Sequence, residues 1–290
     1  MKVISYSLFG YGKPRAKNCD NFNGYLRGLM INVRLQRLIF PDWRIRLYLD
    51  ADTYKGFERF FDLLSGDKWY NAIDIEVCED AHLTKAMLWR LKPMFDPTVE
   101  RFICRDLDSP LMYKDAQAVK QWIDSGKTAH AITASGSHTV PMLGGMIGFT
   151  KYANDFIKAK DWDSMVNQMS GYETKGADQD FLGKYIYRKF AGANHSIMSH
   201  YFFGMPDPFL DGYKTCSCPQ LGTHAEDCPL DIQLEIPREL KETDNICGHI
   251  GAAGYYEIPM NNFLAPYFDK FDDLRQIEEP HNPSIFNWNI

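Results

Sequence analysis

"RFICRDLDSPLMYKDAQAVKQWIDSG", residues 101–126, is the stretch that decides the fold class. Its first residues form an apolar run that is typical of a buried strand and ends at Asp106. Residues 113–126 have the pattern of a helix, and this helix ends at Gly126, as helices often do. A strand that leads through a short loop into a helix is the repeating unit of α/β proteins.

The same alternation extends over about the first 190 residues. Further strands are expected at residues 2–10, 43–50, 72–78 and 128–134. Helices are expected over a segment with apolar residues at helical spacing from Phe22 to Val33, and at residues 52–64 and 83–91. Strands separated by helices predict a mostly parallel central sheet with right-handed crossovers, flanked by helices.

The later part of the chain has weaker patterns. Residues 141–149 are an apolar segment interrupted by glycines, and two helical stretches follow it. From residue 204 onward proline, glycine and cysteine are dense, which indicates loops with a short helix near the C-terminus. We therefore expect an α/β core at 1–203 and a loop-rich extension at 204–290. Because 290 residues suit one substantial domain, both are expected to form one compact unit.

Charge and composition narrow the classes of partner. A net charge of -6 argues against a nucleic-acid partner, since phosphate backbones require a clustered basic surface. The sequence contains no run of about 18 apolar residues that could cross a bilayer, and strand-like residues begin at Val3 without room for a signal peptide. The 7 cysteines are odd in number and unevenly spaced, so most should be reduced thiols. These features predict a cytoplasmic protein.

Asp106 and Asp108 follow the strand in the opening stretch. Carboxyl ends of strands in open α/β sheets are where ligands bind. Carboxylates one residue apart in extended backbone point the same way, and Mg²⁺ and Mn²⁺ prefer oxygen ligands. The pair therefore suggests a divalent metal site that holds a diphosphate. The alternative is that one aspartate caps the next helix and the other is solvated.

An ordered set of motifs resembles a known enzyme family. "FICRDLDSPLMYKDAQAVKQWIDSG", "PMLGGMIGF" and "GADQDFL" occur in the order found in GT-A-fold, nucleotide-sugar-dependent glycosyltransferases of the bacterial and large-virus type, and "CGHIGAAGYYE" at 247–257 extends the likeness. The resemblance implies a GT-A-like, Rossmann-related sheet, with a nucleotide-sugar-binding and catalytic core at 1–203 and an extension at 204–290 that completes the active site. It also implies an enzyme that uses Mn²⁺ or Mg²⁺ to transfer a sugar from a nucleoside-diphosphate sugar to a glycan or glycoconjugate acceptor.

The resemblance also implies roles for single residues. His249 would complete the metal site with Asp106 and Asp108, although a lone histidine is more often structural. The nucleotide pocket would be formed by Ser5, Tyr6 and Ser7.

Two arginines and two glycines are expected near the donor. Arg90 is the first candidate for binding the phosphates and Arg105 the second, because a guanidinium donates two hydrogen bonds to phosphate oxygens. The alternative for either arginine is an ordinary ion pair. Gly144 and Gly145 would let the backbone approach the donor sugar, or would only relieve crowding between a strand and a helix.

The catalytic residues implied on the acceptor side are Asp178, Gln179 and Asp180. In an inverting enzyme one carboxylate would be the general base, and in a retaining enzyme the Asp-Gln pair would face the reacting sugar. Both stereochemical outcomes use these residue types. The alternative is that Asp178 is only a helix N-cap.

A cluster of cysteines departs from the family pattern. Cys216, Cys218, His224 and Cys228 supply enough ligands for a structural Zn²⁺, but their spacing is not a common zinc pattern. The alternative is an insertion with free thiols.

Two other functions remain open. "ICRDLDSPL" also resembles the nucleophile loop of haloacid-dehalogenase-type Mg²⁺-dependent phosphatases, but about 100 residues of α/β pattern precede it, whereas that fold usually begins with this strand. The third possibility is an inactive sugar- or nucleotide-binding protein with the same fold.

Overall fold

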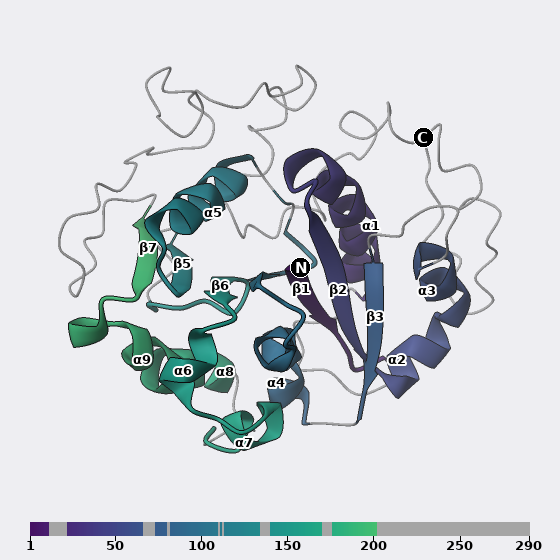
Figure 1. Ribbon diagram of the computed structural model, residues 1–290. Helices are drawn as coiled ribbons and strands as arrows, with labels where there is room; N and C mark the ends of the chain where they lie inside the picture. Colours follow the sequence, from purple (N-terminus) through teal and green to yellow (C-terminus); the bar gives the residue numbers. More distant parts are fainter. Residues whose placement is uncertain are drawn as a thin grey trace.

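A seven-stranded sheet with the order β3-β2-β1-β4-β6-β5-β7 forms the centre of the computed structural model (Figure 1). The structure describes residues 1–11, 22–65, 73–79, 82–109, 111, 113–133, 140–169 and 176–201. The strands are β1 (Lys2–Leu8), β2 (Trp43–Asp50), β3 (Ile73–Cys78), β4 (Arg101–Arg105), β5 (Ala129–Thr133), β6 (Met146–Thr150) and β7 (Ile197–Tyr201). The predicted α/β character is therefore confirmed, and the extension predicted at 204–290 lies outside the described residues.

The sheet is mixed because one strand is reversed. β1 pairs in parallel with β2 and β4, and β2 pairs in parallel with β3. β6 runs antiparallel to both of its neighbours, β4 and β5, while β7 is parallel to β5. The sequence pattern did not predict this reversal. Parallel neighbours require a long crossover, usually a helix, whereas only residues 134–145, which include three glycines and one proline, join β5 to β6.

Helices cover both faces of the sheet. The α-helices are α1 (Phe22–Ile39), α2 (Ala51–Gly56), α3 (Glu58–Ser65), α4 (Leu83–Ala86), α5 (Tyr113–Ser125), α6 (Ala153–Ile157), α7 (Trp162–Val166), α8 (Ala177–Phe181) and α9 (Arg188–Phe190). The 3₁₀ helices are η1 (Trp89–Phe95) and η3 (Gly192–Asn194), and η2 (Leu182–Tyr187) is a π-helix. In Figure 1, α1 and α5 lie in the upper half of the view and α4 and α6–α9 in the lower half.

Two hydrophobic clusters correspond to these two layers. The first cluster joins one face of the sheet to α1, α3 and α5, and the second joins the other face to η1 and α6–α9. On β2, Ile45 and Leu47 belong to the first cluster and Tyr48 to the second. The alternation of side chains along each strand thus divides the sequence between two cores.

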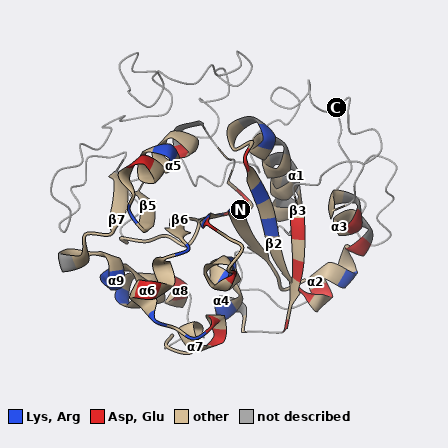
Figure 2. Ribbon diagram, viewed as in Figure 1, with Lys and Arg blue, Asp and Glu red and all other residues tan. Residues whose placement is uncertain are grey.

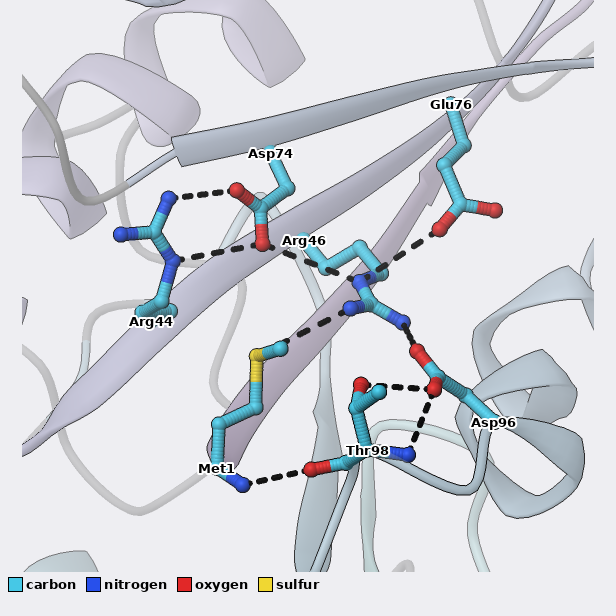
Figure 3. A network of polar contacts seen from close by, with 7 residues as sticks. All are labelled: Met1, Arg44, Arg46, Asp74, Glu76, Asp96 and Thr98. Carbon is cyan, nitrogen blue, oxygen red and sulfur yellow. Dashed lines mark hydrogen bonds and ion pairs between the residues drawn. The ribbon is translucent and has the colours of Figure 1, made fainter.

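Arg46 is the centre of a polar network on the second face, near the N-terminus. β2 carries Lys or Arg where β3, beside it, carries Asp or Glu (Figure 2). The Arg46 guanidinium lies 2.6 Å from Asp96, 3.5 Å from Glu76 and 3.9 Å from Asp74 (Figure 3). Because its side chain is only 7% exposed, these carboxylates compensate a charge that burial would otherwise disfavour. The network ties β2 and β3 to the segment that precedes β4.

The predicted helix at 52–64 is interrupted in the structure. It forms α2 and α3, which are separated at Phe57. A Cβ at Gly56 would lie 2.5 Å from the ring of Tyr11, and that ring packs edge-to-face on Phe57 with centroids 4.7 Å apart. The Tyr11 ring therefore lies in the space that a side chain at residue 56, the last residue of α2, would fill.

Candidate active site at the carboxyl edge of β4

The point where strand order reverses lies between β1 and β4. The chain passes from β1 outward to β2 and β3, and then returns to place β4 on the other side of β1. Loops that leave two such strands diverge, which creates a crevice at their carboxyl ends. Asp106 and Asp108 follow β4 directly at this edge.

Arg90 and Gly145 enclose the Asp106 carboxylate. Arg90 lies on η1, has a side chain that is 8% exposed, and donates from Nη1 to Oδ1 of Asp106 at 2.6 Å. A Cβ at Gly145 would lie 2.0 Å from Oδ2 of the same carboxylate. With the carboxylate in this position only glycine fits, because a Cβ does not come within 3.0 Å of a heavy atom to which it is not linked by the local chain. Gly144 is close to the other partner, since its Cβ would lie 3.0 Å from a terminal nitrogen of Arg90.

Asp108 shares the electrostatic environment of Asp106. Burial, reinforced by the negative charge of Asp106, raises the pKa of Asp108 to about 6. A cation placed beside the two carboxylates would offset this repulsion. The geometry therefore leaves the pair electrostatically suited to a positive ligand.

Asp178 is a third carboxyl group near the same arginine. It lies in the first turn of α8 and is 3% exposed. Burial raises the pKa of Asp178, and Arg90 partly offsets this effect while Asp106 adds to it. Three carboxyl groups from two distant parts of the chain thus interact with one buried guanidinium.

The other two residues of the Asp-Gln-Asp segment point in different directions. Asp180 is 67% exposed and accepts a hydrogen bond from Lys184 at 2.8 Å, so its partner is the next turn of the same helical segment. The side-chain oxygen of Gln179 is buried and has no hydrogen-bond partner among the described residues. Of the three predicted catalytic residues, the structure brings Asp178 to the carboxylate cluster.

Arg105 lies on the opposite face from Arg90. Adjacent residues of a strand alternate, and Arg105 projects toward α5, where it forms a bidentate ion pair with Asp115 at 2.7 and 2.6 Å. Its side chain is 4% exposed and that of Asp115 is 2% exposed. The structure therefore does not bring Arg105 to the carboxylate cluster.

The predicted nucleotide-binding residues on β1 are divided between the two faces. Tyr6 belongs to the first hydrophobic cluster, and burial raises the pKa of its hydroxyl well above the ordinary value. Ser5 is fully buried on the other face, and Ser7 is partly buried. Neither the Ser5 nor the Tyr6 hydroxyl has a hydrogen-bond partner within the described part of the chain.

The donor set at this edge fits a hard divalent cation. Asp106 and Asp108 offer carboxylate oxygens, which Mg²⁺ and Mn²⁺ prefer. Within the described ranges, no group of three or more His, Cys, Asp or Glu side chains is arranged to hold a metal. The predicted third ligand, His249, lies outside the described residues, as do Cys216, Cys218, His224 and Cys228, the proposed zinc ligands.

Two polar residues that support this edge were not predicted as site residues. Asp50, at the end of β2, accepts hydrogen bonds from the backbone N–H groups of Gly10 and Thr53, each at 2.6 Å. Asn32, on α1, bonds to the backbone that follows Asp106. A signal for Asn32 was present, because it lies three residues after Leu29 and therefore on the apolar face of the helix, where a polar side chain requires a partner.

Comparisons with known proteins add no family to this description. No model of a known protein family matches the chain, and no curated protein is similar to it in sequence. Among the helices that the structure describes, none is long and apolar enough to cross a membrane.

Proposed function

We propose that the protein is a metal-dependent glycosyltransferase of the GT-A type. In this proposal it transfers a sugar from a nucleoside-diphosphate sugar to a glycan or glycoconjugate acceptor in the cytoplasm. The observation that carries the proposal is the placement of Asp106 and Asp108 at the carboxyl end of β4, beside the point where the strand order reverses. The buried Arg90 and the glycines at 144 and 145 support it from the same site.

The residues of the site have complementary tasks in this reaction. Asp106 and Asp108 would hold Mn²⁺ or Mg²⁺, which supplies Lewis-acid stabilisation of the departing diphosphate. Arg90 orients the Asp106 carboxylate and adds fixed positive charge where negative charge develops. Asp178 interacts electrostatically with Arg90 and Asp106 of this site, and its raised pKa suits a group that accepts or shares a proton.

The cysteine chemistry of the described residues is consistent with a reducing compartment. Cys78 and Cys104 are buried free thiols. Burial raises their pKa values to about 11 and about 12, so both are protonated and unreactive near neutral pH.

Asp108→Asn tests the proposed function most directly. Purified protein would be screened for Mn²⁺-dependent thermal stabilisation by a panel of nucleoside-diphosphate sugars, and then for release of nucleoside diphosphate with the stabilising donor. We expect Asp108→Asn to lower turnover by about 100-fold or more, because a ligand of the catalytic metal is lost. EDTA should abolish release and Mn²⁺ should restore it.

Asp124→Asn is the matched control for this experiment. Asp124 is 60% exposed on α5 and pairs with Lys120, so its substitution should leave both activity and metal dependence unchanged. Near-normal turnover of Asp108→Asn, or release that EDTA does not affect, would contradict the proposal. Hydrolysis of a phosphomonoester without release from any sugar nucleotide would instead favour the phosphatase alternative.

A further inference from the structure

Asn32 is a fully buried amide on α1 that reaches the loop after β4. Its Nδ2 donates to the Ser109 carbonyl at 2.9 Å and, over a longer 3.4 Å, to the Leu107 carbonyl. Its Oδ1 accepts from the Leu111 backbone N–H at 2.9 Å. The side chain is 0% exposed, and these partners are 75 to 79 residues away in the sequence.

The hydrogen bonds match the needs of this backbone. A loop that leaves a strand has carbonyl and N–H groups without strand partners, and burying them unpaired costs free energy. A primary amide can bind two backbone carbonyls and one backbone N–H of the same loop, because it has two N–H donors and a carbonyl acceptor. The Leu111 N–H also fixes which end of the amide is oxygen.

The hydrogen bonds from Asn32 lie on both sides of Asp108, one of the two candidate metal ligands. Asp108 lies between the two residues whose carbonyls accept from Asn32. A further backbone bond from the Ser109 N–H to the Asp106 carbonyl, at 3.2 Å, closes the turn that carries both aspartates. Fixing the backbone on either side of Asp108 restricts where its carboxylate can lie.

The loop is therefore held from both faces of the sheet. Arg90, from the layer that contains η1, binds the Asp106 carboxylate. Asn32, from the layer that contains α1, forms its hydrogen bonds with the backbone of the loop and not with the carboxylates. This division matters because ligand geometry depends on groups that hold the ligands in place without occupying the site.

We infer that Asn32 is a positioning residue for the Asp106 and Asp108 carboxylates. It acts on the loop backbone and does not touch the ligand. Its consequence for metal binding rests on the proposed function, whereas its ordering of the loop does not. The two parts can therefore be measured separately.

Asn32→Leu removes the hydrogen bonds while keeping a side chain of similar size. The matched control is Gln36→Leu, one turn further along α1. Gln36 is also buried, at 2% exposed, and donates to the carbonyls of Phe40, before β2, and Trp43, the first residue of β2. Both variants replace an amide of the same helix with leucine, but only Asn32 bonds to the carboxylate loop.

Two readouts distinguish the possible results. Hydrogen exchange of the amides at 107–109 and 111 should rise about tenfold in Asn32→Leu beyond any global change, and should remain at the wild-type level in Gln36→Leu. Binding of Mn²⁺ alone, followed by the electron paramagnetic resonance signal of the free ion, should weaken about tenfold in Asn32→Leu only. If Asn32→Leu does not fold, Asn32→Ser and Gln36→Ser replace the pair, with the same expected directions.

Three results would change these conclusions. Unaltered exchange of the loop amides in Asn32→Leu would overturn the inference, whatever the metal does. Faster loop exchange with unchanged Mn²⁺ affinity would overturn the positioning of the ligands. If wild-type protein does not bind Mn²⁺ but Asn32→Leu still loosens the loop, the ordering role is supported and the proposed function fails.

Discussion

The Asp106 carboxylate occupies the space that a side chain at residue 145 would fill. The Cβ of an alanine at this position would lie 2.0 Å from Oδ2 and 2.2 Å from Cγ of Asp106. Gly145 does not have a positive φ, so the requirement for glycine is one of space and not of backbone conformation. The exclusion of a Cβ thereby sets the position of one candidate metal ligand.

Gly145→Ala should displace this carboxylate without unfolding the protein. Because Asp106 is at the edge of the sheet and its side chain is 39% exposed, it can rotate away from the new methyl group. We expect Mn²⁺ affinity to fall about tenfold and the melting temperature to fall moderately, because the rotation also weakens the ion pair of the buried Arg90. Titration of Mn²⁺ into both proteins, with thermal melts in parallel, tests this expectation.

Gly183→Ala is the control for the glycine substitution. The nearest atom to its Cβ would be Cγ of Pro141 at 3.8 Å, an ordinary contact. Its Mn²⁺ affinity should equal that of wild type. Equal affinities in Gly145→Ala and Gly183→Ala would show that the approach of Gly145 to Asp106 has no role in metal binding.

The sequence contained enough information to exclude Arg105 from the site that contains Asp106. Consecutive residues in extended backbone project to opposite faces, so Arg105 and Asp106 cannot both face the same ligand. The ion pair of Arg105 with Asp115 is the structural consequence. The contact of Arg90 with Asp106 could not be predicted in this way, because it depends on how η1 packs against β4.

At the scale of elements, Asp50 joins two strands and a helix. It ends β2, caps α2 through the Thr53 N–H, and accepts from the N–H of Gly10, which follows β1. Gly10 has a φ of 85°, a conformation that favours glycine. Thr53 adds a second tie, because its hydroxyl accepts from the Tyr11 N–H at 3.2 Å.

Asp50→Asn should loosen the segment that leaves β1. An amide has one acceptor oxygen, so one of the two backbone N–H groups would face an NH₂ donor. We expect a loss of about 1–2 kcal/mol in the free energy of unfolding, together with faster hydrogen exchange of the Gly10 amide. Urea denaturation and exchange measured by NMR test both effects.

Asp161→Asn is the comparison for this prediction. Asp161 caps α7 by accepting from the Ser164 N–H at 2.8 Å, and its hydrogen bonds with Ser164 lie within one local turn. Exchange at Gly10 should not change in this variant. Protection of Gly10 that is equal in Asp50→Asn and wild type would contradict the proposed tie.

The strands that sequence patterns missed, β6 and β7, are extended because they pair with neighbouring strands of the sheet. β2 was predicted because apolar and polar residues alternate along it. All five residues of β6 are buried, the strand has no alternation, and two glycines precede it. β7 contains Ser199 and His200, and it becomes a strand by pairing with β5. β5 is also buried at every position but was predicted, so burial on both faces does not by itself hide a strand; β6 and β7 lack the alternation of polar and apolar residues that periodicity requires.

At the scale of the whole molecule, a pair of buried histidines joins α5 to β5 and β7. His130 is fully buried and stacks on Trp122 with ring centroids 5.3 Å apart. His200 packs edge-to-face on His130 at 5.1 Å and lies 3.0 Å from the Gln121 side-chain oxygen. Within the described residues, no group hydrogen-bonds to either ring nitrogen of His130.

These surroundings disfavour the protonated forms. Burial lowers the pKa of His130 well below its ordinary value, with the charges of His200 and Arg105 adding to the effect, and burial lowers that of His200 to about 4. Below about pH 6.5 the unfolded chain therefore binds protons that the native protein does not, and stability falls with pH. Asp108 acts in the opposite direction, because its raised pKa lets the native state bind the extra proton.

Lowering the pH from 7 to 5 should reduce the free energy of unfolding. His200 contributes a loss of about 2 kcal/mol, and His130 contributes a loss in the same direction. Asp108 offsets about 1 kcal/mol, and Asp178 also acts against the loss. His200→Gln keeps a polar group beside Gln121 but cannot titrate, so it should lose about 2 kcal/mol less than wild type over this range. Urea denaturation at several pH values measures the difference, with exposed His82 changed to Gln as the control. If His200→Gln and wild type lost the same stability, His200 would not be a buried neutral histidine in the native protein.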